Sequence, residues 1–162
     1  METVKNLKMS DYSLEGEVWF PLTNEYIGLH IDDFREINHQ HLNLIESLNF
    51  NEDLKSKIES AFFLACESFK HAVGLIEPLL ESKSDIWKYI NFYGMKIDET
   101  SIAQEDTYLV LEASGKWKDG HSYELVIKNG NELCYLGSFL YYPANSYGDI
   151  STNDGNYALK SA

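Results

Sequence analysis

The spacing of apolar residues changes near residue 90, and this change limits the possible folds more than any single motif. Before it, apolar side chains recur every three or four positions, at Leu54, Ile58, Phe62, Ala65, Phe69, Val73 and Ile76. That period predicts a long amphipathic helix, with Asn51 as its N-cap and Pro78 at the end of the region. Beyond residue 90 the spacing falls to two, the period of a half-buried strand.

Four stretches of the second half alternate in this way and are predicted as strands: 93–98, 106–113, 121–128 and 132–142. Asn129-Gly130 separates the last two. This dipeptide indicates a type I′ hairpin turn, because both central residues of that turn need positive φ. The first half contains two further candidate strands, 14–20 and 26–31, which we expect to pair as a hairpin.

A shorter helix is predicted between this hairpin and the long helix, over residues 34–48. Asp32 and Asp33 precede it as candidate N-caps, and Asn49 follows it. Its apolar residues lie on one stripe: Ile37, Leu44, Ile45 and Leu48.

The order of these elements predicts an α+β fold. An N-terminal β-hairpin and two consecutive helices would be followed by a C-terminal antiparallel β-meander, with the helices packed on the sheet. We expect a single domain over residues 1–162, with its core within about 14–142. Residues 143–162 are polar and rich in Asn, Ser and Gly, which favours an irregular C-terminal cover.

Charge is the most distinctive bulk property of the chain. It has 26 Asp and Glu residues against 13 Lys and Arg, a formal net charge of −13. Such a surface repels nucleic acid and anionic lipid and attracts basic proteins. We therefore expect a basic protein partner, with neither nucleic acid nor membrane as a ligand. Acidity that serves only solubility is the alternative.

Several function classes are disfavoured by what the sequence contains. Arg35 is the single arginine, although guanidinium groups are the usual means of gripping phosphate. No phosphate-binding glycine motif or nucleophile elbow occurs, and we expect no cofactor. The apolar runs are too short for a membrane span or a secretory signal, which favours a cytoplasmic protein with reduced cysteines.

A group of carboxylates marks the loop between the first two strands of the meander. Most such groups are simply solvated. Yet negative charge beside aromatic rings suits a cationic protein surface, as in a mimic of nucleic acid. We predict a partner-binding surface made of these carboxylates, their flanking tyrosines and the tryptophan of the next loop: Asp98, Glu99, Glu105, Asp106, Tyr93, Tyr108 and Trp117.

An enzyme is the rival interpretation. Asp119 and His121 flank a turn, and His30 lies on an earlier strand, so the three could form an acid–base or metal site. The sequence indicates no nucleophile beside them, and Asp119-Gly120 is ordinary turn chemistry, which favours a structural role for this corner. His39 and His41 are two positions apart on a predicted helix and point in different directions, so they cannot share a metal ion.

The order of the segments resembles a loosely defined group of small bacterial domains of unknown function. The resemblance is carried by "GEVWFPL", "YIGLHID", "NHQHLNLIESL", "DIWKYINFYGMKID" and "GKWKDGHSYELVIKNGNELCYLGSF". Members often have a Trp-Asp-x-Glu-His-Gly corner. Trp117, Asp119, Gly120 and His121 match it only approximately, because the Glu is missing and the Gly and His are reversed.

Such domains are similar in size and acidity to immunity proteins, which bind and block a toxin delivered by a neighbouring bacterium. The resemblance implies a non-enzymatic toxin inhibitor whose partner is the cognate toxin. A small hydrolase or metal-dependent enzyme, or a regulatory interaction domain, stays open beside it, as does a homodimer formed through an open sheet edge.

Overall fold

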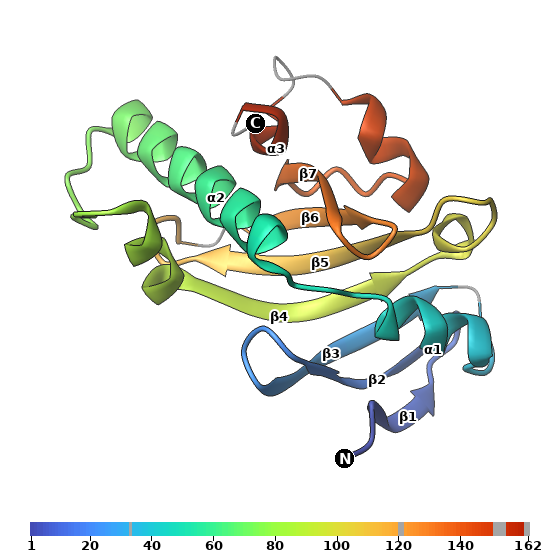
Figure 1. Cartoon of the computed structure of the whole chain (residues 1–162). Coiled ribbons are helices and arrows are strands. Elements are labelled where there is room, and N and C mark those ends of the chain that lie inside the picture. Colours follow the sequence, from blue (N-terminus) through green and yellow to red (C-terminus); the bar gives the residue numbers. More distant parts are fainter. Residues whose placement is uncertain (33, 120–121, 151–154, 161–162) are drawn as a thin grey trace.

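The computed structural model describes residues 1–32, 34–119, 122–150 and 155–160, and the fold is a mixed α+β architecture. One seven-stranded sheet has its strands in chain order from one edge to the other (Figure 1). The strands are β1 (Val4–Met9), β2 (Ser13–Phe20), β3 (Glu25–Asp32), β4 (Ile90–Ile97), β5 (Tyr108–Gly115), β6 (Ser122–Lys128) and β7 (Glu132–Ser138).

The predicted hairpin and meander are parts of this single sheet, which corrects the simpler arrangement expected from the sequence. β3 and β4 pair in parallel, with Gly28 opposite Gly94, and all other neighbours are antiparallel. Parallel neighbours need a long crossover, and the helical segment between β3 and β4 supplies it. β1 adds an edge strand before the predicted hairpin, in a segment for which no strand was predicted.

The long helix α2 spans Glu52–Val73, and its predicted N-cap is confirmed. The Asn51 side chain accepts a hydrogen bond from the Leu54 amide at 2.8 Å. The helix ends at Gly74, whose φ of 72° gives the left-handed C-cap that glycine tolerates best. Ile76 therefore lies outside the helix and is 73% exposed, so its predicted place on the apolar stripe was wrong.

The shorter helix α1 spans His39–Glu46, and its predicted N-cap was also wrong. β3 extends to Asp32, and Asp33 lies outside the described residues. Asn38 caps α1 instead: its side chain accepts hydrogen bonds from the amides of Gln40 and His41. In return, His41 Nδ1 accepts the Asn38 N–H at 3.2 Å, so a histidine completes the capping box.

The main core lies between α1, α2 and one face of the sheet (Figure 1). Phe62 of α2 is fully buried, and its ring meets those of Phe92, Trp117 and Tyr123 edge-on at centroid distances of 6.2, 6.2 and 5.6 Å. Every second residue of the central strands contributes to this core, as the alternation predicted.

A second, smaller core covers part of the opposite face. The 3₁₀ helix Ala144–Asp149 packs there on β5, β6 and β7, where Tyr147 joins Val110, Val126 and Tyr135. The C-terminal segment then reaches the edge strand β7. Asn156 is buried and bonds both the Leu136 N–H and the Cys134 carbonyl. The segment after residue 143 therefore covers this end of the sheet.

The two sheet edges differ as a result. Asn156 and α3 (Tyr157–Lys160) lie against β7, whereas β1 is the open edge (Figure 1). β1 is irregular: its register with β2 shifts between Lys5 and Lys8, and Asn6 between them has a φ of 56°. A shifted register and edge lysines disfavour pairing with another chain.

The predicted Asn-Gly turn between β6 and β7 is confirmed. Asn129 and Gly130 both have positive φ, 50° and 75°. The turn also packs on the end of α1, where the Asn49 amide donates to the Gly130 carbonyl at 2.8 Å. The hairpin thereby fixes the segment that links α1 to α2.

Candidate functional site

The sheet face opposite α1 and α2 carries a hollow over β2, β3, β4 and β5, here called the glycine hollow. Gly28 and Gly94 are paired in register and provide part of its floor, because neither has a side chain. The hollow has a volume of about 250 Å³. Its lining residues are Glu15, Gly16, Gly28, Leu29, His30, Tyr93, Gly94, Met95 and Glu112.

A charged row borders one side of the glycine hollow. Glu15, His30 and Lys96 lie opposite one another on β2, β3 and β4. Asp32 joins two of them: its Oδ1 is 2.5 Å from His30 Nε2 and its Oδ2 is 3.2 Å from Lys96 Nζ. The imidazole is thus oriented by Asp32, while its Nδ1 faces Glu15 Oε1 at 3.8 Å.

The other side is formed by Glu112, whose neighbour on β6 is Glu124. Glu124 is buried and already satisfied, because the Tyr147 hydroxyl and the Leu140 amide donate to its Oε2. Burial, and then the Glu124 charge, raise the pKa of Glu112 above the ordinary 4.5. Among the described residues nothing donates a hydrogen bond to Glu112 or forms an ion pair with it, so its charge is uncompensated at contact distance.

Exposed tyrosines lie beside these carboxylates. Tyr93 lines the hollow and is 38% exposed, and Tyr141 is 77% exposed. Burial raises the pKa of Tyr93, and the charges of Glu112 and Glu124 and the nearby Tyr141 hydroxyl add to that rise. Tyr141 adopts a φ of 57°, in the left-handed region that few non-glycine residues occupy. Aromatic rings and negative charge are therefore combined on this face.

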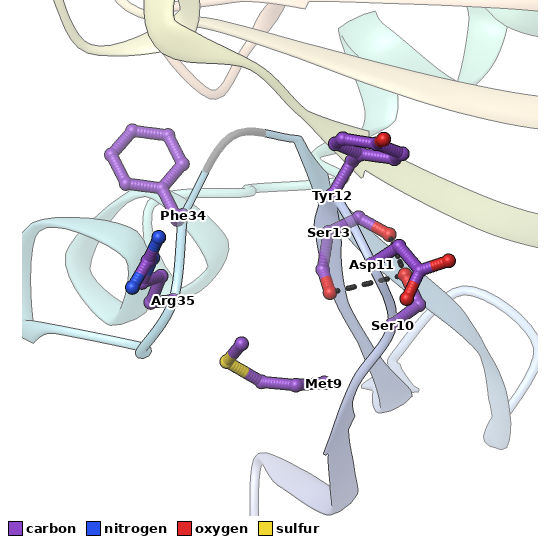
Figure 2. A pocket seen from close by; sticks show the side chains of 7 residues that line it. All are labelled: Met9, Ser10, Asp11, Tyr12, Ser13, Phe34 and Arg35. Carbon is purple, nitrogen blue, oxygen red and sulfur yellow. Dashed lines mark hydrogen bonds between the residues drawn. The ribbon is translucent and has the colours of Figure 1, made fainter.

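A second hollow, of about 360 Å³, lies where the β1–β2 turn faces the segment after β3 (Figure 2). Tyr12 and Asp11 stand on one side of it, and Phe34 and Arg35 on the other. The Ser10 hydroxyl bonds the carbonyl and the hydroxyl of Ser13, so these polar groups are already paired. Tyr12 is almost fully solvent-exposed.

The predicted loop carboxylates have different surroundings. Asp98 accepts hydrogen bonds from Thr100 and, at 3.0 Å, from the Ala144 amide, so it ties the loop to the C-terminal cover. Asp106 pairs with Lys128 at 3.1 Å and accepts from Asn129, and these contacts lower its pKa. Glu99 and Glu105 are exposed. Only these last two offer carboxylates with no such internal role among the described contacts.

The three aromatic residues of the predicted partner-binding surface also have different surroundings. Trp117 is 5% exposed and donates a hydrogen bond from Nε1 to the Tyr123 hydroxyl at 3.0 Å, which places it in the core. Tyr108 is half-buried against the smaller core. Tyr93 alone faces the open side of the sheet, where it lies beside Glu112 rather than beside the loop carboxylates.

The residues of the enzyme hypothesis are only partly described. Asp119 is an exposed turn residue, and His121 lies outside the described residues. His30 is paired with Asp32, and His41 is buried against Phe34 at a ring-centroid distance of 4.4 Å. Over residues 1–32, 34–119, 122–150 and 155–160, no three His, Cys, Asp or Glu side chains are grouped as metal ligands.

Sequence reasoning missed Glu15, Asp32, Lys96 and Glu112 as a group. A local signal exists for two carboxylates, since Glu112 and Glu124 interrupt otherwise apolar strands in "YLVLEASG" and "SYELVIK". A carboxylate at such a position must face a polar partner or solvent. Which strands lie next to one another was needed to bring these residues together.

In the part of the chain that the structure describes, no helix has both the length and the apolar character to cross a bilayer. Comparison with curated proteins and with solved structures gave no significant match. A family model described as "Domain of unknown function (DUF6985)" matches residues 3–142, from β1 through all seven strands and both helices of the main core. The protein therefore belongs to the DUF6985 family.

Proposed function

We propose that this protein is a non-enzymatic binding protein that captures a basic protein partner on the open face of its sheet. The immunity-type role, in which that partner is a cognate toxin, is the biological form of the proposal and rests on the sequence resemblance. The glycine hollow and its exposed tyrosines are the proposed contact surface, and no cofactor takes part.

The observation that carries the proposal is the Glu112 carboxylate, which forms no hydrogen bond or ion pair among the described residues. This carboxylate is half-buried and stands opposite Glu124 on the neighbouring strand. Like charges directly opposite each other destabilise a sheet, and burial makes the charged form less favourable still. A cationic side chain from a partner would relieve both effects at once. A net charge of −13 would also steer such a partner toward the protein.

Aromatic residues would supply affinity on the same face. Tyr93 and Tyr141 are exposed beside the carboxylates, and Tyr142 is about half exposed. Tyrosine is enriched among the residues that dominate binding energy at interfaces, and its ring face attracts cations. Glu99 and Glu105 would act differently. As exposed rim charges they would accelerate encounter without contributing much to the final affinity.

The test begins with a pull-down from the native host using the tagged full-length chain, followed by purification of the basic protein recovered. Association and dissociation rates of that pair are then measured for the wild type, Glu15→Gln/Glu112→Gln, and Glu99→Lys/Glu105→Lys. We expect the first variant to dissociate at least about tenfold faster and the second to associate more slowly at low salt. A partner that binds all three proteins equally would exclude the open face as the contact surface.

A second function, acid–base catalysis, is favoured by one specific observation. His30 is held by Asp32 at 2.5 Å, beside a hollow that also contains Glu112 with its raised pKa. An oriented imidazole near a second carboxyl group is a pattern found in hydrolases. His30→Ala is the discriminating variant. Loss of protection against the toxin with unchanged affinity for the partner would favour the enzyme. Retention of both protection and affinity would exclude catalysis by His30.

A further inference from the structure

The glycine hollow presents hydrogen-bond acceptors from several directions. Glu15 and Glu112 supply carboxylate oxygens on opposite sides. His30 supplies an acceptor at Nδ1 when its Nε2–H donates to Asp32. The Tyr93 carbonyl lies over Gly28, only 3.2 Å from where a Cβ on that residue would be. Lys96, which lies opposite His30 on β4, is paired with Asp32 at 3.2 Å.

The shape of the hollow is equally specific. Gly28 contributes backbone without a side chain to its floor. The Glu112 carboxylate lies directly over Gly94, because a Cβ on that glycine would collide with it. Tyr93 borders the same space with a partly exposed ring. A flat floor, an aromatic ring and acceptors around the margin suit a planar group with donors at its edge.

We propose that the glycine hollow holds one guanidinium group, contributed by an arginine side chain. Its planar fork of five N–H donors can reach carboxylates on two different strands and still bond a carbonyl, and its face can stack on tyrosine. An ammonium group is a compact point charge with three donors and engages fewer of these acceptors at a time. The assignment of that arginine to a protein partner rests on the proposed function, but the specificity of the hollow does not.

The chain itself does not fill the hollow with its own arginine. Arg35, the single arginine, borders the separate hollow at the β1–β2 turn (Figure 2). Two lysines of neighbouring strands are likewise engaged: Lys5 Nζ lies 3.6 Å from the Tyr26 ring centroid, and Lys96 pairs with Asp32. The guanidinium must therefore come from another molecule.

A titration of the full-length, isotope-labelled protein tests this without any partner. The probe is N-acetyl-arginine N-methylamide, and its lysine and citrulline counterparts are the controls for charge and for shape. We expect the arginine probe to shift the amide resonances of Gly28, Gly94 and Glu112, with an affinity several-fold higher than the lysine probe and no saturable binding of the citrulline probe. Glu112→Gln should weaken arginine binding about tenfold, the typical value of one charge-assisted hydrogen bond.

Two further variants distinguish binding of the arginine probe in the hollow from its general attraction to the acidic surface. Gly94→Ala should abolish the preference for arginine, because the added methyl displaces the Glu112 side chain. Glu105→Gln removes one exposed carboxylate away from the hollow and should leave the affinity unchanged. Equal binding of arginine and lysine, or shifts spread over the acidic surface without change at Gly28 and Gly94, would overturn the assignment.

Failure of the guanidinium site and failure of the proposed interface would give different results. Arginine selectivity in the titration, combined with a partner indifferent to Glu15→Gln/Glu112→Gln, would keep the guanidinium site and reject the proposed interface. A partner that needs Glu15 and Glu112, combined with equal binding of the arginine and lysine probes, would keep the interface and reject the guanidinium.

Discussion

Glu112 and Glu124 stand directly opposite each other on β5 and β6, and among the residues that the structure describes only Glu124 accepts hydrogen bonds from the chain. Glu124, 3% exposed, is held by the Tyr147 hydroxyl of the C-terminal cover and by the Leu140 amide, which lies between β7 and the cover. The Glu112 side chain lies over Gly94 of β4, the neighbour of β5 on the side away from Glu124. The cover thus stabilises one negative charge and leaves its neighbour at the border of the glycine hollow.

Replacing Glu112 by Gln should stabilise the fold at neutral pH by roughly 0.2–1 kcal/mol, the usual cost of like charges on opposing strands. Since the pKa of Glu112 is raised above 4.5, the folded chain keeps this proton to a higher pH than the unfolded chain. The resulting stability is complete below pH 4.5 and is lost as pH rises through the folded pKa. Urea unfolding of both proteins across this range measures the effect.

The control for this experiment is Glu105→Gln, which removes an equal charge from an exposed position. It should change stability by only a few tenths of a kcal/mol at any pH. A variant Glu112→Gln that is less stable than the wild type at pH 7 would show that the carboxylate has an internal partner.

Acidification should weaken the fold through His41. Burial lowers the pKa of His41 below 6.5, and its Nδ1 accepts the Asn38 N–H, so a proton on Nδ1 would break the capping box of α1. Because this folded-state pKa is depressed, the stability from neutral His41 is present above pH 6.5 and is lost as pH falls through the folded pKa. Thermal unfolding of the wild type and of His41→Gln, measured from pH 8 to pH 5, should show a shallower pH dependence in the variant. Equal slopes would contradict the assignment.

Asn156→Ala should destabilise the protein by about 1–3 kcal/mol, because it leaves a buried backbone donor and acceptor of β7 without partners. The side chain now accepts from the Leu136 N–H and donates to the Cys134 and Ile150 carbonyls. Amide hydrogen exchange at Leu136 should accelerate beyond the change in global stability. Asn131→Ala, an exposed position in the β6–β7 turn, serves as the control and should have little effect.

Gly130→Ala should cost about 1–3 kcal/mol, the range for a side chain forced into an unfavourable backbone conformation. The φ of Gly130 is 75°, and an added Cβ would also collide with the Ser47 carbonyl at the end of α1. Gly74→Ala provides a matched comparison, because its φ of 72° is similar while no atom lies within 4 Å of the added Cβ. Chemical unfolding of both variants should show the larger loss for Gly130→Ala. Equal losses of stability would mean that the Ser47 carbonyl moves away from the added Cβ without a cost in free energy.

Local patterns predicted much of this fold. The alternation in 14–20, 26–31 and the four later segments marks strands that the structure contains, and Asn51 and Asn129-Gly130 act as predicted. The errors lie where two local signals compete. Asp32 and Asp33 are good caps by type, but β3 continues through Asp32 and leaves the capping position to Asn38.

The candidate site was beyond such patterns. Trp117 follows a strand in a turn-like segment, and only the packing of α2 on the sheet shows that its ring is buried against Phe62. Glu15, His30, Lys96 and Glu112 come from four strands, and nothing in any one segment relates them. Their proximity depends on the parallel pairing of β3 with β4, which brings Gly28 to Gly94 across the helical crossover.

The sequence by itself determined the periods, the turn and most of the core-facing residues, because these depend on interactions within a few positions of the chain. Only the tertiary structure decided which strands are neighbours and in which register, because a period of two defines two faces of a strand without specifying what lies beside it. That register combines two glycines into a hollow and sets two glutamates against each other, and the proposed binding of a cationic partner follows from both.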